Sequence, residues 1–103
     1  MGDLHPFLAV RDTEAAARFY ERAFDARVTE QFGPIYVLEI EGRPVGLAPE
    51  APELGTPSPE TVGATTVRIS LTVDDPDATA EQAVAAGGTL MFPVEDQPYG
   101  KPM

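Results

Sequence analysis

Few residues of this chain could bind or transform a ligand. His5 is the sole histidine, and an imidazole can ligate a divalent metal, move a proton or hydrogen-bond a ligand. Arg68, with Ser70 two residues later, could hold a carboxylate or phosphate, because the guanidinium presents a planar fork of donors. Absence of cysteine excludes thiolate metal sites, disulfides and a cysteine nucleophile. Aromatic side chains that could stack on a planar ligand are those of Phe7, Tyr36, Phe92 and Tyr99.

Each of these residues also has a structural interpretation. His5 could ligate a metal, or it could line a cleft and contact an organic ligand there. Arg68 could equally pair with a carboxylate such as that of Glu39. Aromatic residues most commonly fill a core, and the sequence contains no phosphate loop, no zinc signature and no Ser-His-Asp order worth proposing. The residue types alone therefore leave these alternatives open.

Residues 4–24 predict a strand that runs directly into an amphipathic helix. Side chains alternate along a strand, so residues 4–10 place His5 and Phe7 on one face. Asp12 stands where a helix N-cap belongs. The helix stripe that should bury itself against a sheet consists of Ala16, Phe19, Tyr20, Ala23 and Phe24.

The next residues predict a meander. Alternating segments at 26–32 and 35–41 flank Gly33-Pro34, and a third short strand follows at 45–48. Residues 1–49 therefore predict one β-α-β-β-β unit. Residues 50–64 are rich in proline and without periodicity, which predicts a linker with no secondary structure, either a solvated connector or a lid over a pocket.

The second half repeats the start of the first. Residues 65–73 carry the strongest strand pattern in the chain, Asp75 is a second N-cap candidate, and Gly87-Gly88 should end the helix. The offset that lays Asp12 on Asp75 also lays His5 on Arg68. A strand is expected at 89–94, after which this unit, residues 65–103, lacks the last two strands of the first.

Length and charge narrow the class of protein. A chain of 103 residues predicts a single domain, and its formal net charge of −10 argues against nucleic acid and anionic membranes as partners. With no bilayer-spanning apolar run and no basic-then-apolar leader, we expect a cytoplasmic protein.

With these motifs in order, the chain resembles the vicinal oxygen chelate superfamily, the glyoxalase, bleomycin-resistance and extradiol-dioxygenase group, in its glyoxalase-like subgroup. The matching residues are Pro6-Phe7-Leu8, Val10, Asp12, Ala16, Phe19, Tyr20, Ala23, Phe24, Gly46-Leu47-Ala48, Ser58-Pro59-Glu60, residues 70–75, residues 85–88 and residues 96–100. The resemblance implies an α+β fold of paired βαβββ units whose sheets curl into a cleft, here with the second unit incomplete.

The resemblance also implies a function and a place for it. We expect a protein that binds or sequesters a small organic ligand in the cleft between the units, as a homodimer with or without exchanged units. One alternative is a metal-dependent lyase or dioxygenase that chelates vicinal oxygens of its substrate through His5 and carboxylates outside these 103 residues, since His5 stands where metal-using relatives place a ligand. In the last strand of the first unit no carboxylate occurs until Glu50 at its end. A second alternative is an inactive truncated fragment. Whether a reaction is catalysed, and on what ligand, is left open by these residues.

Overall fold

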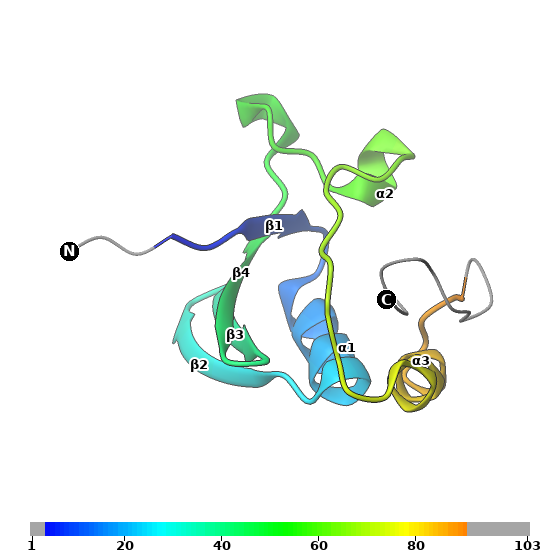
Figure 1. The fold of residues 1–103 in the computed structure, drawn as a ribbon. Helices are drawn as coiled ribbons and strands as arrows, with labels where there is room; N and C mark the ends of the chain where they lie inside the picture. The colour runs from blue at the N-terminus through cyan, green and yellow to red at the C-terminus, as the bar shows by residue number, and fades with distance from the viewer. Residues whose placement is uncertain (1–3, 91–103) are drawn as a thin grey trace.

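Four strands form one mixed sheet in a computed structural model that describes residues 4–90 (Figure 1). The strands are β1 (Phe7–Val10), β2 (Arg27–Phe32), β3 (Ile35–Ile40) and β4 (Arg43–Pro49), in the spatial order β1-β4-β3-β2. The β1 and β4 strands are parallel, and the other two pairings are antiparallel. The expected α+β class and the first β-α-β-β-β unit are confirmed.

Helix α1 (Thr13–Phe24) covers one face of this sheet and begins where the sequence predicts. Asp12 caps it, its carboxylate Oδ1 accepting a hydrogen bond from the Ala15 amide at 3.0 Å. Ala17 is fully buried against the sheet, above the equally buried Leu38 of β3 and Leu47 of β4. Small side chains on the helix thus let it approach the central strands closely.

Two tight hairpins determine how the meander folds. The first turns at Gly33-Pro34, as expected from the sequence. At the second, Glu41 and Gly42 have φ angles of 50° and 74°, the left-handed conformations that favour a two-residue turn between twisted strands. Strand β4 consequently begins at Arg43, earlier than the predicted segment 45–48.

The prediction that residues 50–64 lack secondary structure is wrong. They contain a 3₁₀ helix, η1 (Pro52–Leu54), and one short helix, α2 (Pro59–Val62). Ser58 caps α2 by accepting a hydrogen bond from the Thr61 amide at 3.2 Å, and Pro59 occupies the first turn. A serine followed by proline is itself a helix-start signal, so the sequence contained the cue.

The helix predicted in the second half is confirmed as α3 (Pro76–Ala85), capped by Asp75, whose Oδ1 accepts from the Ala78 amide at 3.1 Å. It lies beside α1 on the side away from the sheet (Figure 1). Gln82 fixes this arrangement, because its side-chain amide donates to the Arg22 carbonyl at 2.8 Å and to Asp25 Oδ1 at 3.0 Å. Within residues 4–90, no helix has the length and apolar character needed to cross a bilayer.

The strand predicted at residues 65–73 is not formed. This segment runs in an extended course from α2 to α3 past α1 (Figure 1) and pairs with no strand of the described chain. High β-propensity reflects the packing of side chains between paired neighbours, and without a neighbour Val67 and Ile69 stay 51% and 44% exposed. Of the strand predicted at 89–94, Thr89 and Leu90 are not in a strand, and the rest lies outside the described residues.

Candidate functional site

A cavity of about 1090 Å³ opens where β1, α1, the β3–β4 turn and the extended segment 66–72 approach one another. Its lining is mostly apolar, and of the described residues that line it only Glu41 and Arg43 are charged. The described lining residues are Phe7, Leu8, Ala9, Val10, Phe19, Tyr20, Phe24, Ile40, Glu41, Arg43, Val45, Gly55, Thr56, Pro57, Pro59, Thr66, Val67, Ile69, Ser70, Leu71 and Thr72. A large apolar space with few polar groups is typical of a site for a small organic molecule.

Helix α1 supplies an aromatic wall of this cavity. Phe19 stands edge-on to Tyr20 and to Phe24, with ring centroids 5.4 and 6.2 Å apart. Burial raises the pKa of the Tyr20 phenol, which keeps the hydroxyl protonated and neutral above the ordinary pKa. The sequence pattern predicts only that these three residues pack on the sheet. In the structure Ala17 is fully buried in the core cluster, whereas Tyr20 and Phe24 are only partly buried against it.

Strand β1 supplies the predicted ligand-binding residue Phe7. In the parallel register Phe7 lies opposite Gly46 of β4, and a Cβ added at Gly46 would come within 2.5 Å of the Phe7 ring. The glycine therefore allows the ring to lie flat across the neighbouring strand. His5 stacks on Phe7 with a centroid separation of 5.3 Å, and both of its ring nitrogens are shielded from solvent. Among the described residues His5 is not part of the cavity lining.

The remaining predicted site residues are dispersed. Ser70 lines the cavity, whereas Arg68, two residues earlier, is exposed and does not. Glu39, named from the sequence as one possible partner of Arg68, accepts a hydrogen bond from Arg27 at 2.9 Å. Tyr36 is 6% exposed in the core beneath α1 and is absent from the lining. Phe92 and Tyr99 lie outside the described residues.

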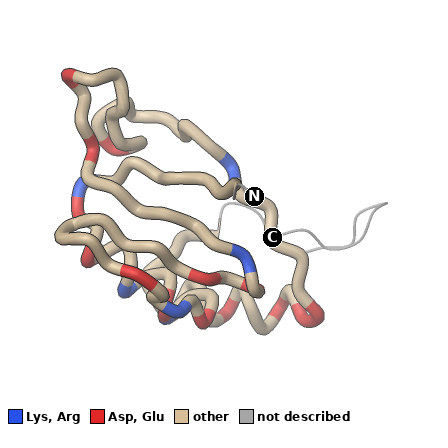
Figure 2. The backbone as a smooth tube through the Cα atoms, turned by 90° about the vertical axis from the view of Figure 1, so that its left-hand side faces the viewer, with Lys and Arg blue, Asp and Glu red and all other residues tan. Residues whose placement is uncertain are grey.

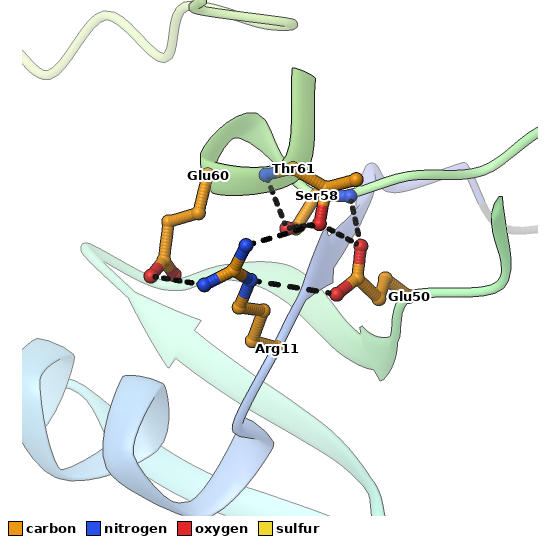
Figure 3. Close-up of polar contacts among 5 residues, drawn as sticks. All are labelled: Arg11, Glu50, Ser58, Glu60 and Thr61. Atoms are coloured by element: carbon orange, nitrogen blue, oxygen red, sulfur yellow. Dashed lines mark hydrogen bonds and ion pairs between the residues drawn. The ribbon is translucent and has the colours of Figure 1, made fainter. Parts of the chain in front are cut away.

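The Glu50 side chain bonds to the crossover, residues 50–64, which joins β4 to the second half of the chain (Figure 3). Its Oε1 accepts hydrogen bonds from the Ser58 amide at 2.9 Å and the Thr61 hydroxyl at 2.7 Å. Its Oε2 faces Arg11 Nε at 3.6 Å. The pKa of the Glu50 carboxyl lies below its usual value. The largest cause is the hydrogen bond from the Ser58 amide, followed by the hydrogen bond from the Thr61 hydroxyl and the charge of Arg11. A lowered pKa makes these contacts stabilising above the ordinary carboxyl pKa and removes that stabilisation as the pH falls through the folded-state value.

The described residues do not fit a divalent metal site. No three of the His, Asp and Glu side chains within residues 4–90 gather closely enough to hold a metal ion, whereas a catalytic zinc site, for example, commonly has three protein ligands. Glu50, the first carboxylate after the last strand of the first unit, accepts hydrogen bonds from Ser58 and Thr61.

Charges are spread over the surface of the described chain. Figure 2 shows Asp and Glu distributed over the helices, turns and crossover, with arginines between them. Arg11, Arg18 and Arg27 each face a glutamate: Glu50, Glu21 and Glu39, respectively. Such exposed pairs contribute little to stability, but they neutralise basic charge locally.

Solved structures with the same fold cover almost the whole chain. A glyoxalase-related enzyme from Fulvimarina pelagi matches with a TM-score of 0.63 and 24% identity, over 99% of this chain and 77% of that one. A hypothetical protein from S. aureus matches with a TM-score of 0.70 and 20% identity, over 95% of this chain and 79% of that one. At these identities the likeness concerns the fold.

Two relatives found by sequence have a higher identity to this chain than these two structures do. An uncharacterized protein of Mycobacterium bovis is 38% identical over 106 residues, covering 94% of this chain and 70% of the relative. An uncharacterized protein of Mycobacterium tuberculosis has the same identity, and this chain spans 62% of its length. The family model for the glyoxalase/bleomycin resistance protein/dioxygenase superfamily matches residues 4–102. With the βαβββ unit and these relatives in agreement, the chain belongs to the glyoxalase/bleomycin resistance protein/dioxygenase superfamily.

Proposed function

We propose that this protein binds a small organic molecule in the cavity between its first unit and residues 66–72. The observation that carries the proposal is the mostly apolar cavity of about 1090 Å³, which is large enough for a small organic molecule. Membership of the superfamily supports it in general terms, because one branch of the family name denotes bleomycin resistance. The metal-dependent lyase or dioxygenase alternative has no fitting ligand group within residues 4–90.

The lining favours an uncharged, flat ligand. Phe7, Phe19 and Phe24 offer apolar faces, while Tyr20 and Ser70 offer hydroxyls that can orient one polar substituent. Glu41 and Arg43 bring opposite charges to the same turn, so the lining has little net preference for an ion.

Binding is tested with the neutral apolar dye Nile red and a panel of planar antibiotics as competitors. We expect saturable dye fluorescence at one site per chain, displacement by at least one competitor, and a thermal shift that grows with competitor concentration. Dye fluorescence that rises without saturation, or that no competitor lowers, would count against a defined site.

We also propose a homodimer, with or without exchange of units. Strand β1 is at the edge of the sheet, with its Val10 carbonyl turned toward β4, where it accepts from the Glu50 amide at 2.8 Å. Alternation along the strand turns the backbone groups of Phe7 and Ala9 outward, to an edge that is unpaired within the described chain. Such an edge is commonly covered by another strand.

Size-exclusion chromatography with light scattering tests the dimer. We expect twice the monomer mass of 11.0 kDa, with a higher monomer fraction on dilution. A mass that stays at that of the monomer at the highest attainable concentration would refute it.

A further inference from the structure

One wall of the cavity belongs to the crossover rather than to the sheet or α1. Thr56, Pro57 and Pro59 line it, yet the crossover contains only the short segments η1 and α2. Helices this short have little stability of their own. The position of this wall must therefore be determined by contacts with a more rigid part of the molecule.

Backbone pairing within the crossover closes only its first loop. Ala51 and Thr56 form an isolated bridge, in which the Ala51 amide donates to the Thr56 carbonyl at 2.8 Å and the Thr56 amide donates back at 3.1 Å. This bridge shapes the turn around η1. It does not include Ser58 or Thr61, which lie in the same part of the crossover as the lining residues Pro57 and Pro59.

Glu50 connects that segment to the sheet. Its amide donates to the Val10 carbonyl at 2.8 Å and so prolongs the β1–β4 ladder past the end of β4. From this fixed backbone its carboxylate reaches across to the Ser58 amide and the Thr61 hydroxyl (Figure 3). Ser58 is fully buried, so water cannot readily replace the carboxylate as the acceptor for its amide.

Arg11 contributes less to this connection. Its guanidinium faces Glu50 at 3.6 Å and Glu60 at 3.8 Å, and its side chain is 53% exposed. Its only hydrogen bond among the described residues runs to the Thr61 hydroxyl at 3.5 Å. Exposed pairs of this length are weakened by solvent, whereas a hydrogen bond from an amide to a carboxylate is among the stronger kinds. Of the two side chains, Glu50 therefore makes the stronger polar contacts with the crossover.

We propose that Glu50 is a positioning residue that holds the crossover wall of the cavity in its binding-competent place without contacting the ligand. The proposal rests on the proposed small-molecule function. Glu50 is not in the described cavity lining, so its effect on binding must pass through Ser58 and the prolines beside it. If the wall is in place only part of the time, the apparent dissociation constant rises by the inverse of that fraction.

The test combines Glu50→Ala with Glu50→Gln and the control Glu53→Ala, an exposed glutamate of the same crossover. Nile red titration measures affinity, and amide hydrogen exchange at Ser58 measures the wall without any ligand. In Glu50→Ala we expect Ser58 exchange and the dye dissociation constant each to rise about tenfold. Glu50→Gln keeps a carbonyl acceptor, so Ser58 exchange and dye affinity should both stay near their wild-type values. Glu53→Ala should change neither the exchange rate nor the affinity.

The outcomes separate the two proposals. Faster Ser58 exchange with dye affinity within about twofold of wild type would overturn the positioning role alone. Unchanged Ser58 exchange in Glu50→Ala would overturn it as well, because the carboxylate would then not hold the wall. Absence of saturable dye binding by the wild-type protein would overturn the small-molecule function and the role of Glu50 with it. If Glu50→Ala does not fold, as judged by circular dichroism, Glu50→Gln must fall between wild type and complete loss in both readouts.

Discussion

Leu38→Ala should lower the free energy of unfolding by about 2 to 5 kcal/mol, the range for truncating a fully buried leucine. Leu38 is 0% exposed in β3, one of the two central strands, and belongs to the cluster that includes Ala17 of α1. The facing residue Ala17 has only a methyl side chain, which is too short to fill the space left by the leucine. The void created by the substitution should therefore stay unfilled. We expect the loss of unfolding free energy to lie toward the upper part of that range.

The matched control is Val37→Ala, one residue away on the opposite face of β3, where the side chain is half-buried. It should cost about 1 kcal/mol or less, because it removes less apolar surface from a solvated face. Denaturant unfolding of both variants, followed by circular dichroism, measures the difference. Equal losses would mean that the α1-facing side of the sheet is not the principal core.

Ile69→Asp should weaken Nile red binding by about tenfold or more, equivalent to roughly 1.4 kcal/mol. Ile69 lines the cavity and is 44% exposed, so a ligand there would cover its remaining apolar surface. The substitution removes that contact, and it obliges the ligand to desolvate a carboxylate that has no partner. Because Ile69 is not part of the sheet or its core cluster, the effect on folding should be much smaller.

The control for this variant is Thr65→Asp, which adds the same charge to the same extended segment outside the described cavity lining. It should leave dye affinity within about twofold of wild type. Fluorescence titration and thermal unfolding are measured on both variants at the same ionic strength. Equal weakening by the two would locate the dye elsewhere or attribute the effect to net charge, and would refute the cavity as the site.

Local sequence signals determined the first unit because each has a local physical cause. Asp12 and Asp75 cap their helices as the repeat predicts, since a side chain and an amide three residues later are sufficient for that bond. Alternation likewise determined which face of β1 carries Leu8 into the core and which carries Phe7 away from it. The same reasoning could have found α2 from Ser58 and Pro59.

The candidate site was predicted less well, because a cavity depends on residues from several elements. Phe7 and Ser70 do line it, but Tyr36 lies on the core face of β3, and Arg68 projects away. The aromatic wall of Phe19, Tyr20 and Phe24 carried the same periodic signal as a core stripe. Which side of that stripe meets the sheet depends on how closely Ala17 lets α1 approach.

The sequence by itself therefore determined the superfamily, the helix starts, the turns and the alternating faces of the first unit. Only the tertiary structure decided that residues 65–73 pair with no strand of the described chain, that a cavity opens beside them, and that the Glu50 carboxylate bonds to Ser58 and Thr61. The reason is physical: caps and turns form between neighbours in the chain, whereas a strand needs a partner edge. A cavity wall, in the same way, needs contacts between residues far apart in sequence.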